Sequence, residues 1–139
     1  DTADIAKEIA IELETYPKNK ASIILLEGDL GSGKTTLVKE ILKSFGLSEP
    51  VTSPTFTIIE PYLIKNKKIY HIDLYRIESR KELEVLGIEE YSVEKDCLIF
   101  IEWPEKAKGF FSEYDLKIRL SHINEISREL IIEKSLNFI

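Results

Sequence analysis

The first clear pattern along the chain is helical. Ile5, Ile9 and Leu13 recur four residues apart, as positions on one face of a helix do, and a polar stretch containing a proline follows them. This spacing predicts a helix over residues 2–16. A second helix is expected over residues 35–45, because a glycine, a common helix stop, stands directly after its last apolar residue.

Two continuous apolar runs predict strands that are buried on both faces. They occupy residues 23–26 and 97–101, and unbroken runs of this kind are typical of central strands in a parallel sheet. Between them, Ser79 stands three residues before Glu82, which matches the capping box that opens a helix, and Gly87 marks the end of that helix.

Further strands are indicated by β-rich and alternating runs. Residues 55–64 and 67–75 flank a short polar pair at 65–66, and this arrangement predicts a hairpin. Residues 116–120 and 130–133 alternate apolar with polar side chains and are expected to form a closing antiparallel pair. The predicted fold class is α/β, with a mainly parallel central sheet, flanking helices and antiparallel additions.

Length and composition indicate a small protein with one domain over residues 1–139. Of these residues 43% are hydrophobic, which is enough apolar mass for one core without disulfides. The single cysteine, Cys97, heads a buried run and is expected to be an inert core thiol. We expect a cytoplasmic location, because neither a long apolar run nor a secretory pattern occurs. Methionine is absent even at position 1, so we expect the sequence to begin inside a longer chain.

The charge is acidic and unevenly distributed. With 25 Asp and Glu against 19 Lys and Arg, the formal net charge is −6, which argues against broad binding to nucleic acid. Residues 77–96 hold seven acids and three bases, a local charge of −4. We interpret this stretch as a solvated helical face, with an acidic docking surface for a basic partner as the alternative.

One motif carries specific chemistry, a glycine-rich loop between the first buried run and the helix that follows it. It matches G-x-x-x-x-G-K-[ST] and consists of Gly28-Asp29-Leu30-Gly31-Ser32-Gly33-Lys34-Thr35. The glycines let successive backbone N–H groups face a phosphate, and the helix adds the positive end of its dipole. Lys34 is expected to reach the β- and γ-phosphates, Thr35 to bind Mg²⁺ and Thr36 to approach the α-phosphate. The motif predicts a nucleoside triphosphate site.

Such a site needs an acidic group near the metal, and two candidates stand at strand ends. Glu102 follows the continuous run at 97–101, and Asp73 ends a more weakly apolar strand. The continuous run is the better candidate for a central strand beside residues 23–26. We therefore favour Glu102 for the metal and Asp73 for positioning water or supporting the metal site, with the division of roles left open.

Several other residues have weaker patterns. Ser53, Thr55 and Thr57 surround a proline where many P-loop proteins carry a nucleotide-sensing loop, although a strand-entry turn explains the pattern equally well. Trp103, the only tryptophan, follows Glu102 directly and is either a core residue or a contact for a nucleotide or a partner. His71 is interpreted as an ordinary strand side chain, because no nucleophile pairs with it. No role is assigned to His122.

As a set, these motifs resemble one family. In chain order they are Gly28 to Leu37, Ser53-Pro54-Thr55-Phe56-Thr57, Tyr62, His71-Ile72-Asp73-Leu74-Tyr75-Arg76, Glu82-Leu83, Gly87 and Ile101-Glu102-Trp103-Pro104. In content and spacing the sequence is similar to the TsaE (also YjeE) family of bacterial ATPases for tRNA threonylcarbamoyladenosine synthesis. The resemblance covers roughly residues 2–105, and residues 106–139 carry no motif that we can match.

The resemblance implies a P-loop NTPase fold and a weak, Mg²⁺-dependent ATPase. It implies action on the threonylcarbamoyltransferase complex, made of the subunit TsaD and its paralogue TsaB, which hydrolysis resets between rounds. The ATP-binding residues that it implies are Gly31, Ser32, Gly33, Lys34, Thr35, Thr36 and Trp103. The same carry-over places Mg²⁺ on Thr35 and Glu102. Catalytic roles are expected for Lys34, Asp73 and Glu102.

Two other classes of function stay open at this point. A small P-loop nucleotide or metabolite kinase would share the loop, but such enzymes clamp phosphates with arginines, and the arginines at 76, 80, 119 and 128 do not suggest a lid. An ATP-gated binding module would depend on nucleotide occupancy rather than turnover. A GTPase is disfavoured, because no Asn-Lys-x-Asp motif follows the loop.

Overall fold

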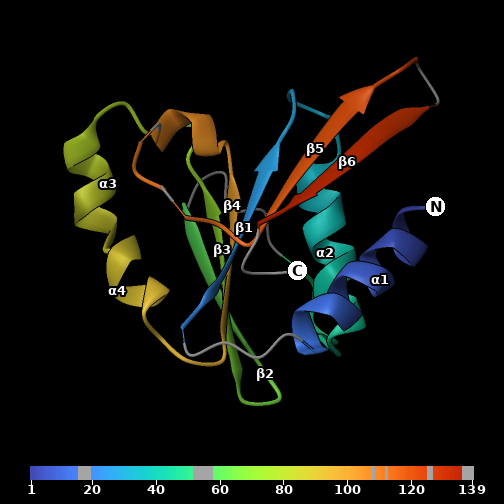
Figure 1. Ribbon diagram of the computed structural model, residues 1–139, viewed down its shortest axis with the longest axis horizontal. Coiled ribbons are helices and arrows are strands. Elements are labelled where there is room, and N and C mark those ends of the chain that lie inside the picture. Colours follow the sequence, from blue (N-terminus) through green and yellow to red (C-terminus); the bar gives the residue numbers. More distant parts are fainter. Residues whose placement is uncertain (16–19, 52–57, 108, 112, 125–126, 136–139) are drawn as a thin grey trace.

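The computed structural model describes residues 1–15, 20–51, 58–107, 109–111, 113–124 and 127–135. Within these residues six strands form one sheet: β1 (Ser22–Glu27), β2 (Ile59–Ile64), β3 (Lys67–Asp73), β4 (Cys97–Glu102), β5 (Leu116–His122) and β6 (Arg128–Lys134). The helical segments are α1 (Thr2–Thr15), α2 (Lys34–Ser44), α3 (Arg80–Leu86), α4 (Ile88–Ser92) and the 3₁₀ turn η1 (Pro104–Ala107). Helices lie on both faces of the sheet (Figure 1).

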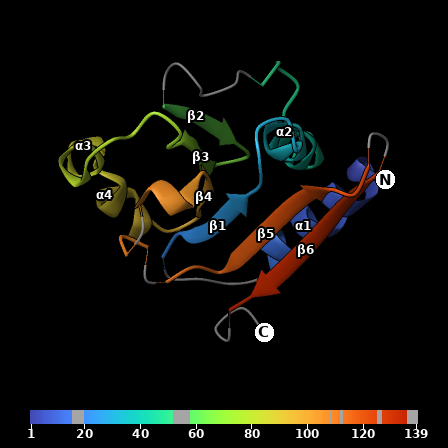
Figure 2. The same ribbon diagram turned by 90° about the horizontal axis from the view of Figure 1, so that it is seen from above.

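The sheet is parallel at its centre and antiparallel at both edges. The strand order is β2-β3-β4-β1-β5-β6, in which β3, β4, β1 and β5 run parallel while β2 and β6 run against their neighbours (Figure 2). All of β4 and most of β1 are buried, which explains why both have continuous apolar sequences. The predicted α/β architecture with antiparallel additions is confirmed.

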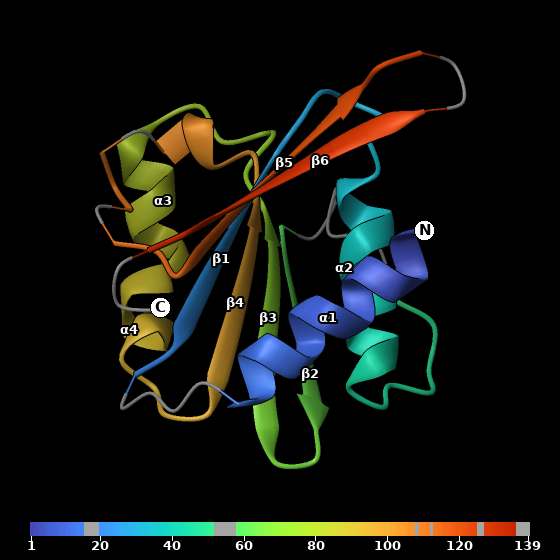
Figure 3. The same cartoon turned by 45° about the vertical axis from the view of Figure 1, so that its right-hand side comes forward.

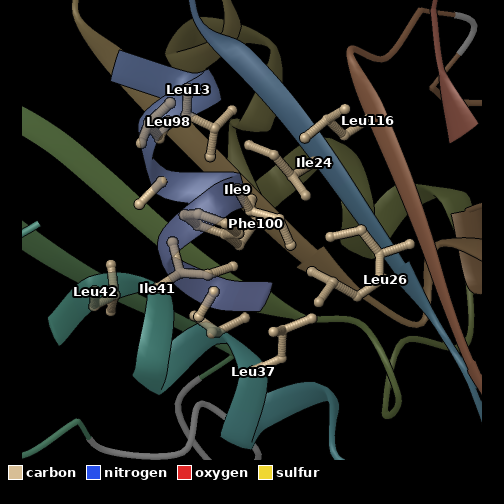
Figure 4. Close-up of a cluster of buried hydrophobic side chains, with 14 of the residues drawn as sticks. Ile9, Leu13, Ile24, Leu26, Leu37, Ile41, Leu42, Leu98, Phe100 and Leu116 are labelled. Atoms are coloured by element: carbon tan, nitrogen blue, oxygen red, sulfur yellow. The ribbon is translucent and has the colours of Figure 1, made fainter. Parts of the chain in front are cut away.

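Alternation along the central strands separates two layers of core. Helices α1 and α2 cover one face of the sheet, and α3, α4 and η1 lie on the other (Figures 1 and 3). Ile24 and Leu26 of β1 join the α1–α2 cluster, whereas Leu25 between them joins the cluster under α3 and α4. Side chains of the first cluster interdigitate closely, with Phe100 of β4 at its centre (Figure 4).

Local signals place the connections as the sequence predicts. Lys65 and Asn66 both have positive φ, 49° and 68°, the conformation of a type I′ turn in a two-residue hairpin. The Ser79 hydroxyl accepts a hydrogen bond from the Glu82 backbone N–H at 3.3 Å and so caps α3. Gly87, at φ 70°, ends α3. Helix α4 was not predicted, because five residues are too few to display a helical period.

Some predicted boundaries shift. Strand β2 begins at Ile59, and part of the predicted strand over 55–64 lies outside the described residues. Glu102 is the last residue of β4 rather than the first residue after it. The described part of the chain holds no helix with the length and apolar character needed to cross a membrane.

Cys97 is confirmed as a buried core residue at the start of β4. Its side chain belongs to the cluster under α3 and α4, and only 3% of the residue is exposed. Burial raises the pKa of the thiol to about 12, because the thiolate would lose its hydration there. The group is therefore a protonated, unreactive thiol at neutral pH.

Candidate nucleotide-binding site

The loop from β1 to α2 is shaped by the glycines at its start and its end. Gly28 has φ +152° and Gly33 φ +103°, in a region that residues with side chains rarely adopt. A Cβ on Gly28 would lie 2.5 Å from the Ser32 Oγ and 2.6 Å from the Leu120 carbonyl oxygen. Tight packing as well as backbone conformation therefore requires glycine at the start of the loop.

A cavity of about 220 Å³ lies over this loop. Its lining residues are Asp29, Leu30, Gly31, Ser32, Gly33, Lys34, Thr35, Thr36, Asp73, Glu102, Trp103 and Arg128. The cavity thus brings together every residue predicted from the sequence to bind ATP, together with both candidate acids. The candidate sensing residues Ser53, Thr55 and Thr57 lie outside the described residues, so that hypothesis stays a prediction.

Glu102 is the buried centre of the polar groups at the cavity floor. It is 3% exposed and ends β4 directly beside β1, where its register partner is Leu26. The Thr35 hydroxyl lies 3.1 and 3.0 Å from its two carboxylate oxygens and donates to them. Parallel strands end at one edge of a sheet, so β3 brings Asp73 next to Glu102 in the same register. This edge is where ligands bind in open α/β sheets.

His71 also belongs to this polar group, which corrects its interpretation as an ordinary strand side chain. The residue is fully buried, and its Nε2 lies 2.5 Å from a carboxylate oxygen of Glu102. Since an ionised carboxylate only accepts hydrogen bonds, Nε2 carries the proton in that state. Nδ1 is buried and has no hydrogen-bond partner among the described residues. Alternation was the available signal, because His71 stands two residues before Asp73 and so shares its face of β3.

Lys34 folds back over its own loop. Its ammonium group donates to the carbonyl oxygen of Gly28 and lies 3.4 Å from that of Asp29. The same nitrogen lies 4.0 Å from the centre of the Trp103 ring, within range of a cation–π interaction. Trp103 has φ 59° directly after β4, and its ring lies 4.9 Å from that of Tyr75. Trp103 packs against the cluster under α3 and α4 and also lines the cavity, so both interpretations of this residue stay open.

Burial shifts two titrating groups at the site in opposite directions. It lowers the pKa of Lys34, although the nearby carboxylates of Glu102 and Glu105 favour the charged amine. It raises the pKa of Asp73, and the backbone N–H of Tyr75, which donates to Asp73 at 2.9 Å, partly opposes that shift. Both shifts favour the neutral form of the group, because burial removes water from the charged form.

Two features suit an anion at the N-terminus of α2. The helix has 11 residues, and its first backbone N–H groups point toward the loop, where the helix dipole is positive. The Ser32 hydroxyl is buried and has no hydrogen-bond partner among the described residues. A bound phosphate oxygen would supply the acceptor that this hydroxyl lacks.

The C-terminal hairpin contributes residues that no sequence motif indicated. His122 Nε2 lies 3.0 Å from the Gly31 carbonyl oxygen, and Arg128 lines the cavity. His122, to which the sequence assigned no role, thus contacts the glycine loop. These residues come from β5 and β6, about ninety positions along the chain from the loop, and no local pattern signals so distant a contact.

A loop that passes from a central parallel strand directly into a helix, with an acid at the end of the neighbouring strand, defines a P-loop α/β protein. Comparison with a crystal structure of Bacillus subtilis YdiB agrees with this class. The two structures superpose with a TM-score of 0.68 at 28% sequence identity, over 92% of this chain and 77% of YdiB.

Comparison with known sequences then identifies the family. The family model described as "Threonylcarbamoyl adenosine biosynthesis protein TsaE" matches residues 1–130. A "tRNA threonylcarbamoyladenosine biosynthesis protein TsaE" of Haemophilus influenzae is 41% identical over 93% of this chain and 80% of its own length. The protein of that name from Rickettsia typhi is 40% identical over 100% of this chain and 92% of its own. The chain belongs to the TsaE family.

Proposed function

We propose that the protein is a Mg²⁺-dependent ATP-binding protein and slow ATPase that serves tRNA threonylcarbamoyladenosine biosynthesis. Membership of the TsaE family gives the biosynthetic assignment. The observation that carries the rest is the contact between Thr35 in the glycine loop and the buried Glu102 at the end of the neighbouring strand. A loop hydroxyl beside a strand-end acid is the arrangement that P-loop proteins use for a metal-bound triphosphate.

Phosphate binding is assigned to the loop backbone, the Ser32 hydroxyl and Lys34. The helix dipole and the curled backbone favour an anion at the start of α2. Lys34 is buried, and burial lowers its pKa. A phosphate would therefore stabilise its charge. To reach the β- and γ-phosphates, the ammonium group must leave the Gly28 carbonyl and the Trp103 ring.

The residues present fit a magnesium ion that takes some of its ligands from the protein and the others from phosphate and water. No group of three or more His, Cys, Asp or Glu side chains that could hold a metal occurs in the part of the chain that the structure describes. Magnesium is commonly held by one or two protein oxygens together with substrate phosphates and water. Thr35 and Glu102 would provide those oxygens, and the ion would offset charge on the phosphates. Asp73 lies beside Glu102 in register, which suits orientation of the attacking water.

The proposed partner is the threonylcarbamoyltransferase pair TsaD and TsaB, which the family resemblance implies. ATP would close Trp103 and the predicted loop at Ser53, Thr55 and Thr57 over the site and so create a surface for the partner, and hydrolysis would release that surface. Loss of γ-phosphate contacts is a common way to release such a surface. The net charge of −6 supports action through a protein partner rather than direct binding of tRNA.

The deciding experiment measures ATP hydrolysis by the purified protein with and without the TsaD–TsaB pair. We expect slow turnover alone and stimulation by the pair. Lys34→Ala and Glu102→Gln should abolish the stimulated rate, while Lys7→Ala on the solvent side of α1 should leave it unchanged. Full activity in either site variant would overturn the proposal.

A second arm of the experiment addresses the alternative functions. Stoichiometric phosphorylation of a small-molecule acceptor without any partner would favour a kinase. Equal rates of ATP hydrolysis with and without the pair would exclude TsaD and TsaB as the partners that stimulate the protein. ATP-dependent binding of the pair without turnover would leave an ATP-gated binding module.

A further inference from the structure

The β5–β6 hairpin packs directly on the glycine loop. It extends beyond the sheet on the side where β1 turns into α2 (Figures 1 and 3). Near its base, the Leu120 carbonyl oxygen would lie 2.6 Å from a Cβ on Gly28, so the two backbones are in close contact. Further out, His122 donates from Nε2 to the Gly31 carbonyl at 3.0 Å, because a carbonyl oxygen can only accept. The hairpin is thus fixed to the loop at two successive points.

Strand pairing brings an arginine to a third point. Arg128 begins β6 and is the register partner of His122, so the contact that fixes His122 also fixes the backbone of Arg128. The guanidinium lies over the last glycine of the motif, where a Cβ on Gly33 would be 2.5 Å from Arg128 Nη1. The positive φ of Gly33 requires glycine at this position, and the end of the arginine side chain occupies the space where a Cβ would lie.

Arg128 also changes the charge balance of the cavity. The lining side chains include three carboxylates, Asp29, Asp73 and Glu102, and two cations, Lys34 and Arg128. Among the described residues the side chain of Arg128 makes no hydrogen bond or ion pair, whereas that of Arg119 in the same hairpin contacts Glu27 and Glu133. Arg128 is exposed and lines the cavity, and a guanidinium without a carboxylate partner is suited to bind a phosphate by paired hydrogen bonds.

We propose that Arg128 binds the phosphate chain of the nucleotide, so that the C-terminal hairpin forms one wall of the ATP site. This inference rests on the proposed function, since it concerns how the same site holds ATP. His122 acts as a positioning residue. Its hydrogen bond to Gly31 fixes the end of β5, and β5 pairs there with Arg128 at the start of β6. The hairpin, which carries no recognisable motif, thereby completes a site that the glycine loop begins.

The test compares Arg128→Gln with Arg119→Gln, which removes the same charge from the same hairpin but away from the cavity. Equilibrium binding of MgATP and MgGTP is measured over a series of salt concentrations, with thermal unfolding of each variant as a check on folding. We expect Arg128→Gln to weaken both nucleotides by about tenfold and to flatten the dependence on salt. Arg119→Gln should bind as the wild type does, and Arg128→Lys should recover part of the loss.

Each other outcome has a definite meaning. Unchanged ATP binding by Arg128→Gln, while the wild type binds and Lys34→Ala does not, overturns the inference and leaves the proposed function intact. Equal weakening of nucleotide binding by Arg128→Gln and Arg119→Gln also overturns the inference. The positive charge of the hairpin as a whole, rather than a contact from Arg128, would then explain the binding. A loss confined to ATP over GTP would indicate a base contact instead of a phosphate contact. If the wild type binds no nucleotide, the proposed function fails and the inference fails with it.

Discussion

The contact between His71 and Glu102 leads to a prediction that distinguishes two roles of His71: orienting the Glu102 carboxylate and stabilising the fold. The imidazole is fully buried and its Nε2–H reaches a carboxylate oxygen at 2.5 Å. Replacing His71 by Leu removes this donor and leaves the Thr35 hydroxyl as the group that holds Glu102. Gln is the matched variant, because its terminal amide carries an N–H donor at a reach similar to that of Nε2.

The size of the effect follows from the kind of bond that is lost. A hydrogen bond to an ionised group contributes about 1.5–3 kcal/mol, and loss of a group that orients a metal ligand commonly costs about 10–100-fold in metal affinity or activity. We therefore expect His71→Leu to raise the Mg²⁺ concentration needed for half-maximal ATPase activity by about tenfold or more. His71→Gln should recover most of that loss.

The assay is ATP hydrolysis titrated with Mg²⁺ for the three proteins, with the thermal unfolding temperature recorded for each. A purely structural role would change the amount of folded protein but not the Mg²⁺ midpoint of the folded fraction. The reasoning is refuted if Leu leaves the midpoint at the wild-type value. It is also refuted if Gln and Leu, both folded, are impaired to the same degree, since the N–H donor would then be irrelevant.

Three further predictions concern the loop, the acid and the thiol. Gly28→Ala combines a positive φ with a clash against the loop and β5, so we expect a loss of about 1–3 kcal/mol in unfolding free energy, measured by urea titration. Burial raises the pKa of Asp73; its contribution is therefore fully present below the unfolded pKa and is lost as pH rises through the folded pKa. Asp73→Asn should accordingly raise the unfolding temperature at pH 7 more than at pH 4, and an equal change at both would contradict this. Cys97 should resist a thiol reagent at pH 8 until urea unfolds the protein; reaction at full rate in the native state would show that the thiol is exposed.

The sequence indicates the central framework well because the relevant signals are local. Unbroken apolar runs predict β1 and β4, and the glycine motif between a strand and a helix predicts where phosphate chemistry lies. Glu102 could be placed beside the loop because parallel strands end at one edge of a sheet. Each of these inferences needs only a segment and its immediate neighbours in the chain.

The missing parts of the site depend on contacts that no segment encodes by itself. The role of His71 depends on the register between β3 and β4, which puts its side chain within reach of Glu102. Arg128 reaches Gly33 because a hairpin from the end of the chain packs on a loop near its beginning. Helix α4 is too short for periodicity to reveal it. The placement of these residues at the site therefore depends on strand register and on packing between distant segments, which a motif search does not detect.

The cation–π contact between Lys34 and Trp103 has a practical consequence. The chain contains one tryptophan, and its ring lies 4.0 Å from the ammonium group that must move when a triphosphate enters. Tryptophan fluorescence from this chain therefore originates at the candidate nucleotide site. The fluorescence of Trp103 can therefore be used, without an added label, to follow the movement of Lys34 away from the ring when a triphosphate is added.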